Sequence, residues 1–139
     1  MQHLRNIAFL ATLALPFPAL AEDMPSLSLE LNTTDTIGES CRLTFVLTNG
    51  LADDIDKLVT ETVLFSDQGG VVLLTLFDFA ELPTGRPRVR QFRVPDTSCD
   101  RLGQVLINGV DTCTIGQYPS DTCQAALTLS SRVKIGLQG

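Results

Sequence analysis

The sequence predicts an all-β fold in which two antiparallel sheets pack against each other. Between residues 41 and 94, four apolar runs rich in β-branched side chains are separated by the turn signals Asn-Gly, Asp-Gln-Gly-Gly and Pro-Thr-Gly. Several runs alternate apolar with polar residues, as half-buried strands do. Four cysteines after residue 40 indicate a disulfide framework. These three observations favour one small β domain with disulfide cross-links.

Residues 1–21 have the three-part pattern of a secretory signal peptide. Arg5 supplies a positive charge, residues 7–15 are apolar, and Ala19-Leu20-Ala21 is an A-x-A cleavage site. The apolar run is shorter than the about 20 residues that a membrane-spanning helix needs. No Cys follows the cleavage site and Asn6 follows Arg5, so neither a lipid anchor nor the twin-Arg route is favoured. We therefore expect cleavage after Ala21, export to the periplasm, and a mature domain of residues 22–139.

The expected mature chain is strongly acidic. All 16 acidic residues lie after Ala21 and Arg5 lies before it, so nine basic residues remain and the net charge becomes −7. An acidic surface repels phosphate backbones, which argues against nucleic acid as a partner. No later run of about 18 apolar residues occurs, so we expect no membrane span in the mature protein.

The four cysteines, Cys41, Cys99, Cys113 and Cys123, all lie in the expected mature part. An even count in an exported chain suggests two disulfides, for which three connectivities exist. Cys113 and Cys123 bracket the polar loop TIGQYPSDT, where a local bridge forms easily, and this leaves Cys41 to pair with Cys99. A redox or metal-binding thiol site is the alternative, but the chain has no Cys-x-x-Cys and the spacings are wide.

The first two strands show clear alternation. Leu27, Leu29 and Leu31 alternate with polar residues, which predicts a half-buried strand, and residues 33–40 should form a turn region. Apolar residues then resume at every second position. The inward set of this second strand is expected to be Cys41, Leu43, Phe45 and Leu47.

Residues 49–57 form a polar connection that carries three carboxylates, Asp53, Asp54 and Asp56. They could bind a hard cation, but no EF-hand spacing follows, and a solvated loop is favoured. A short helix is the alternative, because apolar residues fall at helical spacing. These residues are Leu51, Ile55 and Leu58.

The strand expected at residues 58–65 has an ambiguous buried face. Glu61 shares one parity with Val59, Val63 and Phe65, whereas the other parity holds two leucines and two threonines. If Glu61 faces the core, its carboxylate needs a buried partner. An edge position in the sandwich is the favoured interpretation.

A hairpin turn is expected at residues 66–70, where glycines supply positive φ. Residues 71–79 are then almost continuously apolar. Such a run is either a strand covered on both faces or an exposed patch that meets a partner. It contains Phe77 and Phe79, two large side chains that a contact surface could use.

After the turn Leu82-Pro83-Thr84-Gly85, residues 86–94 carry four of the nine basic residues of the expected mature chain. The four are Arg86, Arg88, Arg90 and Arg93. On an acidic protein this strip could receive an anionic partner. It could also pair with the protein's own Asp and Glu residues, which is the favoured interpretation because charge runs are usually solvated faces.

The rest of the chain predicts a loop at residues 95–103, a strand at 104–107, a last strand at 125–135, and a frayed tail. Asn108-Gly109 either turns a tight hairpin or bends the strand before Cys113. With about seven strands in one small domain, the pattern is that of a two-sheet antiparallel sandwich of immunoglobulin-like type.

The segment VLTNG…LVTETVLFSDQGGVVLLTLFDFAELPTGRPRVRQFRV, within residues 46–94, resembles the core pattern of FxLYD-type and related bacterial immunoglobulin-like envelope domains. Phe65-Ser66-Asp67 stands where many members have Tyr-Asp, and no F-x-L-Y-D is present. The whole chain also resembles small alphaproteobacterial exported proteins of unassigned role, some of which carry a twin-Arg-signal label. Both resemblances imply a periplasmic β-sandwich, and neither supplies a catalytic residue.

The only histidine is His3, which lies in the expected signal peptide. The mature domain then has no imidazole, which excludes Ser-His-Asp and Cys-His nucleophile activation and His-ligated metal sites. We expect no cofactor, no metal and no catalytic residue.

Two functional hypotheses follow from these observations. The first is a non-enzymatic protein-binding or accessory module of the cell envelope, which contacts an envelope protein through Phe77, Phe79 and the four arginines of the strip. The second is a carboxylate-based hydrolase or small-ligand binder. That activity requires a concave pocket lined by at least two of Glu61, Asp78 and Glu81.

Overall fold

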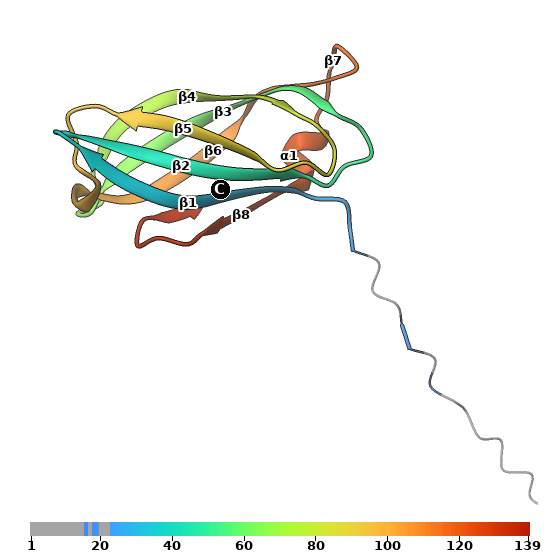
Figure 1. The fold of residues 1–139 in the computed structure, drawn as a ribbon, viewed down its shortest axis with the longest axis horizontal. Helices are drawn as coiled ribbons and strands as arrows, with labels where there is room; N and C mark the ends of the chain where they lie inside the picture. The colour runs from blue at the N-terminus through green and yellow to red at the C-terminus, as the bar shows by residue number, and fades with distance from the viewer. Residues whose placement is uncertain (1–15, 17, 20–22) are drawn as a thin grey trace, which may run out of the picture.

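The computed structural model describes residues 16, 18–19 and 23–139. Most of the expected signal peptide, including the cleavage site after Ala21, lies outside the described residues. The described residues fold into an all-β sandwich of two sheets, as the sequence predicts (Figure 1).

One sheet has four strands in the order β5-β2-β1-β8, and the other has five, in the order β4-β3-β6-β7 with β9 also paired to β6. Two short helices, η1 (Cys99–Arg101) and α1 (Thr122–Ala126), precede β6 and β8. The strands are β1 (Leu27–Ile37), β2 (Ser40–Asn49), β3 (Ile55–Ser66), β4 (Val71–Leu82), β5 (Arg88–Val94), β6 (Leu102–Ile115), β7 (Tyr118–Pro119), β8 (Leu127–Ser131) and β9 (Gly136–Gln138).

The chain crosses between the two sheets after β2, β4 and β5, and again after β7 and β8. Strands β1, β2 and β5 are neighbours in one sheet, and β4, β3 and β6 are neighbours in the other. This is the strand order of an immunoglobulin-like sandwich. The expected architecture is therefore correct for the first six strands.

The C-terminal part departs from the expected single strand at residues 125–135. The chain forms α1 and then β8, which pairs in parallel with β1, and after a bend β9 pairs in parallel with β6. The two sheets are therefore mixed rather than purely antiparallel. The hydroxyl of Ser131 stabilises the bend, because it donates to Ile135 O at 2.6 Å and accepts from Val133 N–H at 3.3 Å. Residues 136–138 are paired rather than frayed.

The core contains the inward sets that alternation predicts for β1 and β2. All three β1 leucines and the four inward β2 residues are fully buried, and β1 and β2 form a hairpin whose turn uses Gly38 at φ +60°. Positive φ costs glycine little, because it has no Cβ.

The buried face of β3 is the one that carries threonines. Thr60 and Thr62 are fully buried with the leucines of the same parity, and the two hydroxyl oxygens lie 2.9 Å apart in a hydrogen bond. Glu61 faces the outer surface, where its carboxylate accepts a hydrogen bond from the Asn108 amide. Two hydroxyls can satisfy each other in a core, whereas an unpaired carboxylate could not. The expected edge position is wrong, because β3 lies between β4 and β6.

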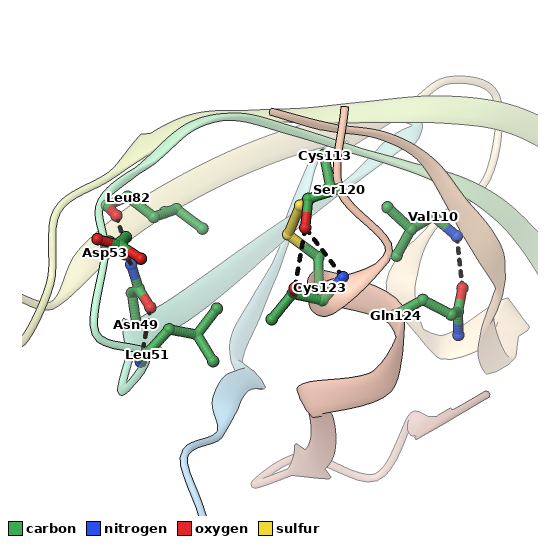
Figure 2. The surroundings of a disulfide bond; sticks show 10 residues. Asn49, Leu51, Asp53, Leu82, Val110, Cys113, Ser120, Cys123 and Gln124 are labelled. Atoms are coloured by element: carbon green, nitrogen blue, oxygen red, sulfur yellow. Dashed lines mark hydrogen bonds between the residues drawn. A yellow bond between two sulfur atoms is a disulfide. The ribbon is translucent and has the colours of Figure 1, made fainter. Parts of the chain in front are cut away.

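The connection from β2 to β3 is a loop, and the alternative of a short helix is wrong. The fully buried Asn49 amide organises it, because Nδ2 donates to Asp53 O and to Leu82 O, each at 2.9 Å, and Oδ1 accepts from Leu51 N–H at 2.9 Å (Figure 2). The loop carboxylates also bind backbone. Asp54 accepts from Thr84 N–H and Asp56 accepts from Gln117 N–H, each at 2.7 Å.

Both predicted disulfides are present. Cys41 on β2 pairs with Cys99 in η1, and Cys113 on β6 pairs with Cys123 in α1. Figure 2 shows that the second bridge holds α1 against β6, where the Gln124 side chain also accepts from Val110 N–H at 2.9 Å. Asn108-Gly109 lies within β6 and does not turn a hairpin.

Candidate protein-contact surface

The outer side of β4 carries the main group of exposed aliphatic side chains. The exposed fractions are 65% for Val71, 37% for Val72, 61% for Leu74 and 53% for Leu76. We call these four residues the β4 strip. Leu74 and Leu76 face outwards because strand residues alternate, and the residues between and beside them are partly or fully buried. Since β4 is the last strand of its sheet, its second backbone edge has no neighbouring strand among the described residues.

The β4 strip ends near two carboxylates. Leu74 lies opposite Val63 on β3, whereas Leu76 lies opposite Glu61. Two residues further along β4, the Asp78 carboxylate lies 3.6 Å from the Lys57 ammonium, and both side chains are about half exposed. The result is an uncharged aliphatic surface with acidic groups at one end.

The assignment of Phe77 and Phe79 to a contact surface is wrong. They are 4% and 0% exposed, respectively, and face the core. Phe77 stacks on Phe92 of β5 with ring centroids 4.1 Å apart, and Phe79 meets the same ring edge-on at 5.1 Å. Phe45 completes this aromatic cluster from β2. The sequence did contain a signal for the correct parity, because Asp78 between the two phenylalanines must face solvent.

The arginine strip does not form the ion pairs that the sequence favours. None of Arg86, Arg88, Arg90 and Arg93 has a carboxylate within 4.0 Å in the part of the chain that the structure describes. Arg88 donates to Pro87 O at 3.2 Å. Arg90 reaches from β5 to β4, where Nε donates to Phe79 O at 2.7 Å and Nη2 donates to Glu81 O at 3.0 Å. The N–H donors of a guanidinium can bind two backbone carbonyl oxygens, just as they can bind the two oxygens of one carboxylate.

Arg90 therefore divides the edge of β4 into two parts. From Phe79 onwards, the edge is covered by the guanidinium, and the chain is distorted at Ala80, which has φ +58° beside a shift in the β3–β4 register. Among the described residues, no other strand pairs with residues 71–78 along that edge, and the Asp78 carboxylate makes only a local contact by accepting from Ala80 N–H at 2.9 Å. We call residues 71–78 the open edge of β4.

The structure does not gather the three carboxylates of the alternative hypothesis around a cavity. One groove among the described residues, of about 740 Å³, lies near the Cys113–Cys123 bridge and is lined by Asp111, Ser120, Asp121 and Gln124, among others. Glu61, Asp78 and Glu81 line neither this groove nor four other grooves, of about 320–550 Å³. The described residues also contain no group of three or more His, Cys, Asp or Glu side chains placed to hold a metal ion.

Comparisons with protein-family models, with curated proteins and with solved structures gave no match. Within residues 16, 18–19 and 23–139, no helix is both long and apolar enough to cross a membrane.

Proposed function

We propose that this chain is a non-enzymatic protein-binding module of the cell envelope, which contacts its partner through the β4 strip and the open edge of β4. The observation that carries the proposal is the exposure of Leu74 and Leu76 on a strand whose backbone edge is also unpaired. Exposed edges of this kind accept an added strand through main-chain hydrogen bonds, and neighbouring side-chain contacts give specificity.

Burial of this surface supplies part of the free energy of a contact. Full burial of one leucine side chain contributes about 1.5–3 kcal/mol, so two half-exposed leucines and two valines offer a few kcal/mol before any hydrogen bond forms. A long apolar edge is also a hazard for aggregation. An exposed apolar edge that persists despite this hazard is typical of a binding surface, and this supports a binding role.

The cellular compartment belongs to the same proposal. The two disulfides are compatible with an oxidising compartment, and the signal-peptide pattern of residues 1–21 points to export. A partner would then be met in the periplasm, where β4 is accessible after folding.

The test is site-specific photo-crosslinking in intact cells that export the full chain. A photo-reactive amino acid replaces Leu74 on the open edge or, as the control, Val89 on β5, which is also an exposed aliphatic residue at 55%. We expect a defined protein adduct from position 74 and none from position 89, identified by mass spectrometry. Equal labelling from both positions, or no protein adduct from position 74, would contradict the proposal.

A further inference from the structure

We infer that the partner seated on the open edge of β4 is a second copy of this chain, paired β4 to β4 about a two-fold axis. This inference rests on the proposed function, since it names the partner of the same surface. Most soluble homo-oligomers are two-fold dimers in which the same patch is used by both subunits. The two ends of the open edge, its side-chain pattern and its charge all fit that symmetry.

The first end of the open edge is the β3–β4 turn. Ser66 N–H donates to Gly70 O at 2.7 Å, and Gly70 N–H donates back to the Ser66 hydroxyl at 3.1 Å. The turn does not cover the free edge of β4. Its Asp67 N–H donates to Arg101 O at 2.9 Å, on the opposite side, where β6 lies. Pairing can therefore begin directly after Gly70.

The second end is the point where Arg90 engages Phe79 O. The span between Gly70 and Phe79 is centred near Leu74. In an antiparallel pair, opposite residues lie on the same face of the sheet, so a two-fold axis must place one residue opposite itself. When Leu74 is that residue, each copy's pairing stops before the other copy's guanidinium is displaced.

The same register joins apolar groups and separates charged ones. Leu74 of one copy meets Leu74 of the other, and Leu76 lies opposite Val72. Asp78 lies opposite Gly70, which has no side chain, so no two carboxylates face each other within the paired span. This matters because the whole chain carries a net charge of −6 and would otherwise repel its own copy.

Other occupants fit the surface less well. A bilayer surface with anionic lipids attracts basic residues, whereas the charged groups beside the strip are Glu61 and the ion pair of Asp78 with Lys57, which leaves one negative charge. The paired span is short, so the interface should be smaller than the about 1,600 Å² of a standard complex, and association should be reversible and concentration-dependent. A strand of a different protein on the same edge is a separate outcome, which photo-crosslinking from position 74 detects.

The first experiment measures association of the exported, oxidised full chain by sedimentation equilibrium across a range of concentrations. We expect a monomer–dimer equilibrium whose dissociation constant rises at least tenfold in Leu74→Lys, because the two-fold axis brings the two ammonium groups together. Val89→Lys, the matched control on β5, should leave the constant unchanged. Circular dichroism and thermal unfolding of both variants confirm that each one is folded.

The second experiment tests the register. The structure has no free cysteine, so Leu74→Cys introduces a single reactive thiol. Opposed residues of an antiparallel pair have Cα atoms about 4.5–5.5 Å apart, which lies within the range that a disulfide spans. Mild oxidation should link Leu74→Cys into a covalent dimer at least ten times faster than Leu76→Cys, whose opposite neighbour is Val72.

The outcomes separate this inference from the proposed function. A chain that stays monomeric at every concentration, or a dimer that Leu74→Lys does not weaken, overturns the β4–β4 dimer. If that chain still gives a photo-adduct with a different protein from position 74, the binding module stands and only its partner was wrong. Faster linkage through Leu76→Cys would overturn the Leu74-centred register.

Discussion

The open edge of β4 and the neighbouring strand β5 carry opposite kinds of side chain at a sheet edge: apolar on β4 and charged on β5. Both strands lie at the edge of their sheets, on the same side of the sandwich (Figure 1). β5 carries three arginines in seven residues, and one of them hydrogen-bonds the carbonyls of β4. The open edge carries exposed valine and leucine, and its only charged residue is Asp78 at one end. Charged residues on an edge oppose strand addition, whereas an apolar edge invites it.

Other edge strands are limited in a different way from β5, by their length or by proline. β7 is two residues long and ends in Pro119, and β8 is five residues long. Short edges and proline both limit pairing with another chain. The open edge of β4 has neither of these features and carries exposed aliphatic side chains, which supports its assignment as the contact surface.

The largest expected effect distinguishes the two faces of β4. Phe79→Ala removes a fully buried ring from the aromatic cluster and should destabilise the fold by about 3–5 kcal/mol. Leu76→Ala, three residues away on the exposed face, should change stability by about 0.5 kcal/mol or less. Urea unfolding of both variants, followed by fluorescence or circular dichroism, measures the difference. Similar losses in the two variants would mean that the assigned faces are wrong.

The disulfides should differ in how much they stabilise the two sides of the sandwich. Chain-entropy reasoning gives about 4 kcal/mol for Cys41–Cys99, which joins residues 58 apart, and about 3 kcal/mol for Cys113–Cys123, which joins residues 10 apart. Paired Cys→Ser variants of each bridge, unfolded in urea without reductant, test this ranking. A smaller loss from the Cys41–Cys99 pair than from the other would reverse it.

Arg90 tests whether the closed part of the β4 edge depends on its guanidinium. Arg90→Lys keeps the charge but loses the fork that reaches both Phe79 O and Glu81 O, and should cost about 1 kcal/mol of stability. It should also lengthen the accessible edge and increase self-association. Arg93→Lys on the same strand is the control. Urea unfolding measures the change in stability, and sedimentation measures the change in self-association. Equal behaviour of the two variants would show that Arg90 does not close the edge.

The smallest expected effect concerns the charged end of the open edge. Lys57 and Asp78 form an ion pair at 3.6 Å between half-exposed side chains. Solvent screens such pairs, so Lys57→Ala should change stability by about 0.5 kcal/mol or less. Unfolding at low and high salt checks this, and a larger loss that salt abolishes would show that the pair has a structural role.

The sequence was most informative where alternation and cysteine spacing were clear. The inward residues of β1 and β2 follow directly from period-two patterning, and the local Cys113–Cys123 loop leaves one partner for Cys41. In residues 71–79 nearly every position is apolar, so Asp78 alone indicates which face of the strand meets solvent, and both faces otherwise look suitable for a core. The orientation of Phe77 and Phe79 then depends on which side the aromatic rings of β2 and β5 occupy.

Other features depend on contacts that leave no local pattern. Arg90 binds backbone carbonyls of a strand in the opposite sheet, and carbonyls have no sequence signature. The buried threonines of β3 satisfy each other through a hydrogen bond between their hydroxyls, and the polarity of these residues alone does not indicate that their face is buried. The split of the last strand into β8 and β9 depends on two parallel pairings with distant strands.

Hydrogen–deuterium exchange as a function of protein concentration tests the contrast between the two edges most directly. In the purified full chain, the amides of residues 71–78 that do not donate to β3 should exchange quickly when dilute and become protected as concentration rises, whereas residues 88–94 should keep one rate throughout. Unchanged exchange across residues 71–78, or protection that grows equally on β5, would contradict the assignment of the open edge as the place where this protein associates.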